Sequence, residues 1–339
     1  MGGKKYKKGN WRLGRPKLVL LLGIIGVYYT EGNSSVKGMA MKVFVGVTDY
    51  SWYSFLKESK PDEVNFWQPS GNDQFRVLQP GELFLFKLKG RENAIAGGGF
   101  FARFSILPNF LAWEAFGEKN GANEFEDFYK PIDLYKKRNN IHHTNIGCII
   151  LSDPFFFEQE DWIQVPSDWA SNIVRGKSYT DATPIGRNLI NQVLERIRQP
   201  EVVGEQAVRY GTTTTSYRLG QGGFRIAVTD AYNRRCAISG ARTLPILDAA
   251  HIKPVKSSGV HAVDNGLLLR TDIHALYDLG YVTITTDYHI EVSPRLEKEY
   301  GNGKLYYGYH GLLVPNLPQA IKERPSKENL MWHNEQIYR

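Results

Sequence analysis

The sequence HAVDNGLLLRTDIHALYD, residues 261–278, combines a turn, a strand and a short helix. An Asn-Gly pair leads into the apolar run GLLLR (266–270), which is typical of a short buried strand. In the helical segment that follows, His274 and Asp278 are four residues apart and therefore lie on one face. A single turn of helix thus presents an imidazole and a carboxylate side by side.

The residues before this stretch predict a second strand next to it. The segment TLPILDAAHIKPV (243–255) indicates a strand that ends at His251 and enters a loop limited by proline. Residues 224–240 favour a helix that ends in a Ser-Gly turn, and residues 281–293 favour a β-hairpin. We therefore expect a β-turn-β-α unit, with His251 at the end of its first strand and His274 on its helix.

The segments CAISG, LDAAHIKP, VDNGLLL and DIHALYDLG resemble the HNH endonucleases with the ββα-metal fold, in the subgroup that carries an A-A-H-I-x-P strand. The resemblance is strongest from residue 224 to about residue 290. Residues 41–339 as a whole are similar to bacterial HNH endonucleases with a distinct N-terminal domain. The resemblance implies that His251 is the general base and that Asn265 holds the loop and orients the base. It also implies that His274 and Asp278 bind one divalent ion at the scissile phosphate.

Ala250 departs from the family pattern, because many HNH enzymes have a metal-binding acidic residue or histidine immediately before the base. Asp248, two residues earlier, would point to the same side of an alternating strand, so it is our candidate for the missing ligand. Nitrogen and oxygen donors suit Mg²⁺, Mn²⁺ or Ni²⁺, and Zn²⁺ stays open. We expect one divalent ion, held by His274, Asp278 and Asp248.

Basic residues near the motif are candidates for contacts to DNA phosphates, which position a duplex without reading its sequence. They are Arg225, Arg234, Arg235 and Arg270. The alternative for each of them is an ion pair on the protein surface.

Several other residues are expected to be structural. Cys236 should pack as a small apolar residue, because Ser239 stands where the second thiol of a zinc pair would be. Trp332 is expected to be a packing anchor, and His333 is an outside candidate for the site. Three further histidines fit no motif and are expected on the surface: His261, His289 and His310.

The N-terminal half predicts a separate mixed α/β domain over residues 41–180, within a chain of α+β class. Apolar runs bounded by Gly, Pro and Asn predict strands at 42–47, 83–88, 94–101 and 146–157, and aromatic spacing predicts helices within 111–121 and 124–139. An amphipathic helix at 184–198 and a breaker-rich stretch form a connection, residues 181–223. A nuclease domain of residues 224–339 follows.

The segment VLQPGELFLFKLKGRENAIAGGGFF (77–101) is similar to the small β-barrels of the PUA and EVE type, which hold a base in an aromatic pocket. Its glycine run would let the backbone approach a ligand closely. By this resemblance Trp52, Phe66 and Trp67 line the pocket, and a modified base flipped out of the duplex is the ligand. The alternative is that these aromatic residues belong to the core.

Composition sets broader limits. The chain has 339 residues, 42% of them hydrophobic, which is enough for two globular domains, and its net charge of +7 favours polyanionic partners. Two distant cysteines indicate no disulfide framework and suit the cytoplasm. Residues 1–40 are basic, then apolar over LVLLLGIIGVYY, then polar; we expect a leader outside the fold, with export or anchoring as the alternative. No stable membrane partner is expected.

These observations predict a restriction or defence endonuclease that cuts double-stranded DNA, with an N-terminal domain that selects the DNA, including DNA with modified bases. Cutting both strands would require two sites and hence a homodimer. Two alternatives stay open: a non-catalytic DNA-binding protein that keeps the fold, and a nuclease activated by a nucleotide. Motifs of hydride transfer, kinases and zinc peptidases are absent from the sequence.

Overall fold

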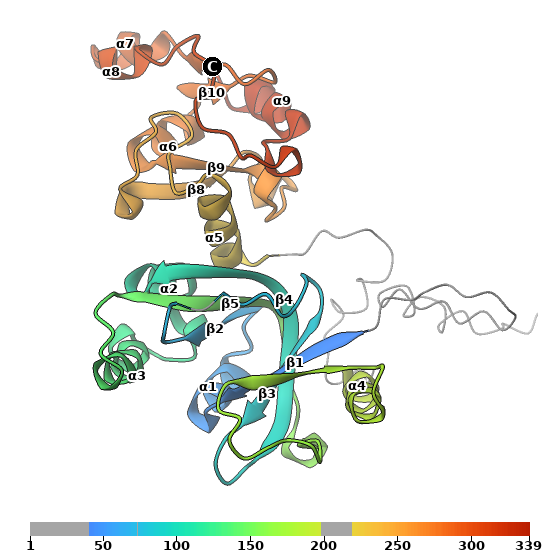
Figure 1. The fold of residues 1–339 in the computed structure, drawn as a ribbon. Coiled ribbons are helices and arrows are strands. Elements are labelled where there is room, and N and C mark those ends of the chain that lie inside the picture. The colour runs from blue at the N-terminus through green and yellow to red at the C-terminus, as the bar shows by residue number, and fades with distance from the viewer. Residues whose placement is uncertain (1–40, 73, 198–218) are drawn as a thin grey trace, which may run out of the picture.

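The computed structural model describes residues 41–72, 74–197 and 219–339, which form two parts joined through a helix (Figure 1). The predicted leader, residues 1–40, and most of the predicted connection, residues 198–218, lie outside the described residues. Among the residues that are described, no helix is long and apolar enough to cross a membrane.

The N-terminal part is built on a seven-stranded sheet in the order β2-β5-β4-β3-β1-β7, with β6 paired to β4. Its strands are β1 Lys42–Thr48, β2 Glu63–Gln68, β3 Leu83–Leu88, β4 Ala94–Pro108, β5 Asn145–Phe156, β6 Ile163–Gln164 and β7 Gly176–Thr180. Only β1 and β3 are parallel among these pairs. The pairing runs from β2 to β7 without returning to β2, so a closed barrel of the PUA or EVE type is not confirmed.

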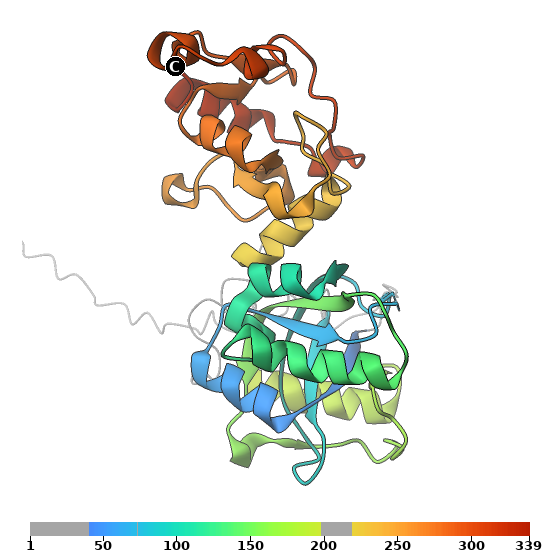
Figure 2. The same ribbon diagram turned by 90° about the vertical axis from the view of Figure 1, so that its left-hand side faces the viewer.

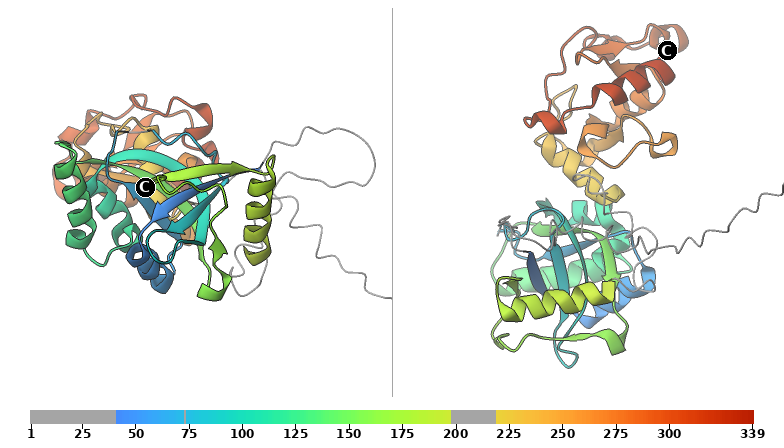
Figure 3. Two further views of the ribbon diagram at one scale, coloured as in Figure 1. Left: turned by 60° about the horizontal axis from the view of Figure 1, so that its bottom comes forward. Right: turned by 90° about the vertical axis from the view of Figure 1, so that its right-hand side faces the viewer.

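Helices cover both sides of this sheet. They are α1 Tyr50–Ser59, α2 Asn109–Phe116, α3 Phe125–Arg138 and α4 Pro184–Ile197. Helices α1 and α3 lie in front of the sheet in Figure 2, whereas α4 lies in front of it in the right panel of Figure 3. Leu189, Ile190 and Val193 of α4 pack against Val43 and Val45 of β1. Helix α4 is therefore part of the N-terminal core, not of an interdomain connection.

The glycine run of β4 is required by strand packing. A Cβ atom on Gly97 would lie 2.3 Å from the Phe155 carbonyl oxygen, and one on Gly98 would lie 2.5 Å from the Phe84 carbonyl oxygen. These neighbours belong to β5 and β3, so the close approach expected for a ligand is instead an approach between strands.

The aromatic residues proposed for a base pocket lie mostly in the core. Trp52 and Phe66 are each 7% exposed, and their ring centroids are 5.4 Å apart. The indole nitrogens of Trp52 and Trp67 both donate to the backbone oxygen of Asn120, at 2.9 and 3.0 Å. Trp52 and Phe66 therefore do not form an open cage, and the indole N–H of the half-buried Trp67 is already used.

The C-terminal part contains the predicted ββα unit. Strands β8 Leu247–His251 and β9 Gly266–Arg270 are antiparallel and are followed by α6 Thr271–Asp278. A hairpin of β10 Val282–Ile284 and β11 Ile290–Val292 follows, then α7 Arg295–Tyr300, α8 Lys304–Tyr307 and α9 Lys327–Gln336. Short 3-10 helices are η2 Gly117–Asn120, η3 Gln159–Asp161, η5 Leu244–Ile246, η6 Val255–Ser257, η7 Val263–Asn265 and η8 Ile321–Glu323.

Helix α5, Gln221–Ala231, lies between the two parts in Figures 1 and 2 and is packed into both cores. Ile226 belongs to an apolar cluster with Ala112 of α2 and Ile150 of β5. Phe224 and Val228 belong to the core of the C-terminal part. Burial of apolar side chains on both sides of one helix ties the two parts together.

A buried carboxylate holds the first turn of α5. Glu63, at the start of β2, is fully buried and accepts hydrogen bonds from the backbone N–H groups of Gly222 and Gly223, at 2.8 and 2.9 Å. Lys119 lies 3.1 Å from the same carboxylate. A Cβ on Gly222 would lie 2.5 Å from the backbone oxygen of Ala115, so glycine permits this close docking. Glu63 thus satisfies free N–H groups of a helix whose Gly222 lies 159 residues later in the chain.

We expect Glu63→Gln to lower the free energy of unfolding by about 2–4 kcal/mol, because it removes a buried charge that is bonded to two N–H groups and to Lys119. Urea denaturation measures this change. Glu158→Gln is the control. The Glu158 side chain is 71% exposed, so its ion pair with Lys57 should contribute little to the free energy of unfolding. Equal effects of the two variants would contradict the assignment.

Candidate active site

Asn265 closes the loop that follows His251. Its side chain is fully buried: Oδ1 accepts from the backbone N–H of Lys253, and Nδ2 donates to the backbone oxygens of Lys253 and Val260, each at 2.9 Å. These three bonds use most of the hydrogen-bonding capacity of the amide. The chain between β8 and β9 is thereby folded back toward His251.

His251, at the end of β8, lies between an aromatic ring and a second imidazole. Its ring is stacked on Phe224 of α5, with centroids 4.0 Å apart and an interplanar angle of 12°. Its Nε2 is 3.0 Å from Nδ1 of His261. The expectation that His261 is a surface histidine unrelated to the site is therefore wrong. It is half-buried at the end of the loop that Asn265 closes.

The surroundings of His251 favour its neutral form. Burial, together with the neighbouring His261 and His274, lowers the pKa of His251 to about 4, and burial is the largest cause. A neutral imidazole has a free lone pair that can accept a proton, so the ring is a candidate general base near neutral pH.

His274, on α6, lies between two carboxylates. Its Nε2 is 3.3 Å from Oδ2 of Asp278, and its Nδ1 is 3.6 Å from Oδ2 of Asp248. Burial raises the pKa of Asp278, and His274 opposes that shift. The structure thus brings together the three residues that the sequence nominated as metal ligands.

Asp248 reaches this cluster from strand β8. It lines the pocket together with Ala249 and His251, whereas Ala250 is fully buried in the core. Strand β8 pairs with β9 without a register shift, so the alternation that puts Asp248 on the side of Ala250 is retained. Asp248 is also 4.0 Å from Arg225 of α5.

The donor chemistry around His274 fits an open metal site with few protein ligands. Within the described ranges, no group of three or more His, Cys, Asp or Glu side chains is arranged to hold an ion together. Since Asp278 and Asp248 face opposite nitrogens of one ring, only one of them can share an ion with His274. The other can then fix the orientation of the ring from its far nitrogen, as carboxylates do behind metal-bound histidines.

These groups open into one pocket of about 750 Å³ between α5, β8, α6 and the loop after β8. His251, His261, His274, Asp248 and Asp278 all line it. Arg225 lines it too, although Glu114 lies 3.3 Å from its guanidinium. Lys256, an exposed loop residue, is a second basic group at the pocket, and it was not singled out in the sequence.

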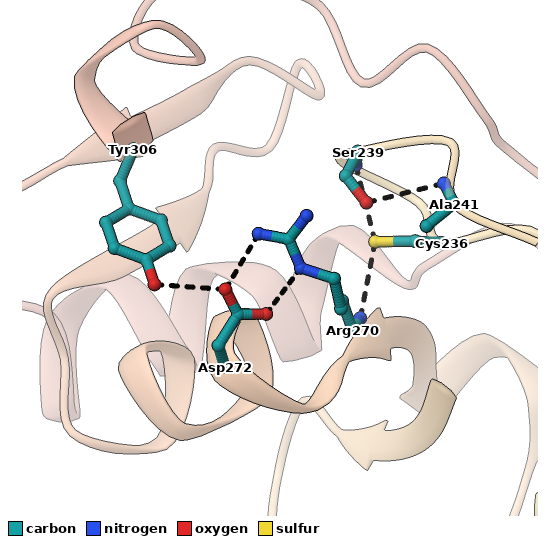
Figure 4. A network of polar contacts seen from close by, with 6 residues as sticks. All are labelled: Cys236, Ser239, Ala241, Arg270, Asp272 and Tyr306. Carbon is teal, nitrogen blue, oxygen red and sulfur yellow. Dashed lines mark hydrogen bonds and ion pairs between the residues drawn. The ribbon is translucent and has the colours of Figure 1, made fainter. Parts of the chain in front are cut away.

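The other nominated arginines lie away from this pocket. Arg234 donates to the backbone oxygen of Ile106 in the N-terminal part, so it is an interdomain contact. Arg235 is half-buried and is not part of the pocket lining. Figure 4 shows Arg270 in a two-pronged ion pair with Asp272, at 2.6 and 2.7 Å, and Asp272 also accepts from Tyr306. The Arg270 side chain lowers the pKa of Asp272 to about 2, so Arg270 is committed to that pair.

Figure 4 also shows why Cys236 is a structural residue. It is fully buried, and its sulfur accepts from the backbone N–H groups of Ser239 and Arg270, each at 3.3 Å. This agrees with the expectation of a packed cysteine.

The four other residues singled out in the sequence lie in different surroundings. His333 is 2% exposed, and its two ring nitrogens contact Thr283 and the backbone oxygen of Tyr277. His289 pairs with Asp287 on the surface, and His310 is exposed. Trp332 is half-buried, with the ammonium group of Lys253 5.8 Å from its ring centroid.

Comparison with known proteins identifies the domain that holds this pocket. The family model described as HNH endonuclease matches residues 236–285, which include β8, β9 and α6. Over these residues, the match confirms the resemblance to HNH endonucleases and the enzyme class that it implied. No curated protein sequence matches the chain.

Two solved structures are similar at low level. A mutant of the ZmASCH protein from Zymomonas mobilis is 8% identical, covers 44% of this chain and 96% of its own, and has a TM-score of 0.31. A modification-dependent TagI restriction endonuclease is 12% identical, covers 81% of this chain and 75% of its own, and has a TM-score of 0.27. Both TM-scores are too low to establish a shared fold.

The depressed pKa of His251 predicts a pH dependence of stability. Below pH 6.5 the unfolded chain binds a proton at this ring that the folded chain does not bind until about pH 4. Stability should therefore fall as pH decreases through this window. His251→Asn, which cannot titrate, should lose about 1 kcal/mol less than wild type between pH 7 and pH 5, after allowance for partial exposure. Urea denaturation in EDTA checks this, with His289→Asn as the control. An equal loss in wild type and His251→Asn would refute the assigned pKa.

Proposed function

We propose that this chain, whose residues 236–285 form an HNH endonuclease domain, is a metal-dependent endonuclease that hydrolyses phosphodiester bonds of DNA. The observation that carries the proposal is the meeting of a neutral imidazole, His251, and an imidazole-carboxylate pair, His274 and Asp278, in one pocket. Hydrolysis of a phosphodiester requires a base for water and positive charge near the phosphate.

His251 has the role of general base. Its Nε2 is occupied by the contact to His261, so the free nitrogen is Nδ1. This atom takes a proton from a water molecule as the water oxygen attacks phosphorus, in line with the leaving 3′ oxygen. The Phe224 ring fixes the plane of the imidazole by stacking. Asn265 does not touch His251 through these bonds; its side chain holds the loop that carries His261, and His261 in turn contacts His251.

His274, with Asp278 or Asp248, holds one divalent ion in this proposal. When bound, the ion supplies positive charge at the scissile phosphate and at the leaving oxygen. Nitrogen and carboxylate donors suit Mg²⁺, Mn²⁺ or Ni²⁺, and Zn²⁺ is a further candidate. Arg225 and Lys256 add fixed positive charge at the pocket and are the proposed contacts to neighbouring phosphates.

We expect the full chain to cleave plasmid DNA with a divalent ion and to lose this activity in EDTA. His251→Ala should lower the rate by about 100- to 10,000-fold, because it removes the general base. Gel electrophoresis of supercoiled plasmid, with Mg²⁺, Mn²⁺, Ni²⁺ and Zn²⁺ tested in turn, measures both effects.

His289→Ala is the matched control, because it removes a histidine that pairs with Asp287 outside the pocket. Cleavage that survives in His251→Ala would exclude this mechanism. Binding of DNA without cleavage by wild type would instead support a non-catalytic DNA-binding protein. Nicked plasmid would indicate a monomer, and linear plasmid would indicate two chains acting on one duplex.

The N-terminal domain is proposed to select the DNA, with a modified base as the candidate feature, which makes the protein a restriction or defence enzyme. Support comes from its attachment to the nuclease domain. Glu63 and the apolar cluster around Ile226 fix helix α5. Phe224 of this helix is stacked on His251, the proposed general base. DNA bound by the first domain would therefore be held at a defined distance from the pocket.

If this selection operates, cleavage rates should differ among matched plasmids that carry cytosine, methylcytosine or hydroxymethylcytosine. A pocket that accepts one flipped base loses contacts or gains clashes with the others. Initial rates under identical salt conditions measure the preference, and His251→Ala provides the background. Equal rates on all three substrates would count against a reader of these modifications, without bearing on the nuclease site.

A further inference from the structure

The contact between His251 and His261 indicates a role for His261 in the active site. This role rests on the proposed nuclease function. The loop after β8 ends beside the strand at which it began, and this brings the two imidazoles to 3.0 Å between Nε2 of His251 and Nδ1 of His261. Their ring centroids are 5.0 Å apart, and the planes meet at 62°. The edge of the His261 ring that contains Nδ1 therefore faces the His251 ring.

This contact is the one described hydrogen bond of the His251 ring, as far as the structure describes the chain. Of its other described neighbours, Phe224, on α5, stacks its apolar face on the ring, and His274, on α6, acts on it only through charge. Neither orients the imidazole by a hydrogen bond, so the neighbour that can decide which nitrogen carries the proton is His261.

Two arrangements of the proton are consistent with two neutral rings. If Nδ1 of His261 donates, His251 carries its own proton on Nδ1, and its lone pair is used up inside the pair. If Nε2 of His251 donates, the lone pair lies on Nδ1 of His251 and is free to accept a proton from water. Only the second arrangement makes His251 a base, because a neutral imidazole has one donor and one acceptor nitrogen.

We propose that His261 is a positioning residue of the active site: its Nδ1 accepts a hydrogen bond from Nε2 of His251 and so keeps the base in the reactive tautomer. Once His251 has taken the proton of water at Nδ1, the ring is a cation. The same Nε2–H then donates to His261 as a charge-assisted bond, which stabilises that cation. No proton leaves along this bond, and the tautomer is restored when Nδ1 releases its proton.

The test compares His261→Asn with His261→Leu in the full chain. The two side chains are similar in size, but only asparagine keeps an acceptor oxygen near the position of Nδ1. We expect His261→Leu to lower kcat for DNA cleavage by about 10- to 100-fold, with KM unchanged, and His261→Asn to retain most of the activity. His289→Asn controls for the loss of a histidine outside the pocket.

The second readout is the tautomer of His251, from the ¹⁵N spectrum of protein labelled at histidine, with the His251→Asn variant to assign the signal. We expect the Nε2–H form in wild type and in His261→Asn, and a mixture in His261→Leu. An Nδ1–H form in wild type, or a His261→Leu variant with wild-type tautomer and rate, would overturn the proposal. An Nε2–H form in a protein that cleaves no DNA would uphold the hydrogen bond and refute only the nuclease function.

Discussion

A buried carboxylate, Glu63, lies where the two halves of this protein meet. Glu63 has no exposed surface, so its charge has to be compensated inside the protein, and the compensation comes from two N–H groups of α5 and from Lys119. The helix held in this way is part of both cores, and its Phe224 contacts His251. The position of the candidate base thus depends on a side chain that lies nearly two hundred residues earlier in the chain.

The candidate site combines an apolar wall with polar neighbours. Burial, together with His261 and His274, favours the neutral form of His251, and stacking on Phe224 fixes the plane of its ring. His274 is instead flanked by two carboxylates, which suits a ring that shares a cation. The surroundings of the two imidazoles in this pocket therefore differ. Those of His251 suit a group that accepts a proton, and those of His274 suit a group that binds a metal ion.

The sequence predicted those parts that depend on local pattern. The ββα unit and the positions of His251, His274 and Asp278 follow from strand and helix periodicity over fewer than forty residues, and the structure has them as expected. Contacts made across loops or between domains have no such local signal. The neighbour His261 was therefore missed. The ion pair of Arg270 and the burial of Trp52 were foreseen only as alternatives, because a sequence does not show whether a side chain is already committed to a partner or to the core. Helix α1 and strand β2 were also not foreseen, since their aromatic residues suggested a binding pocket.

The shared helix α5 has a consequence for exchange of domains between proteins. A graft of the nuclease half onto another recognition module would separate Gly222 and Gly223 from their acceptor and expose the apolar face around Ile226. A working chimera would have to bring a matching acid and a matching apolar surface with its new module. Genetic recombination that exchanges one half would meet the same requirement. It would yield a folded protein only with a module that already has such an acid and apolar surface, or when both halves move together.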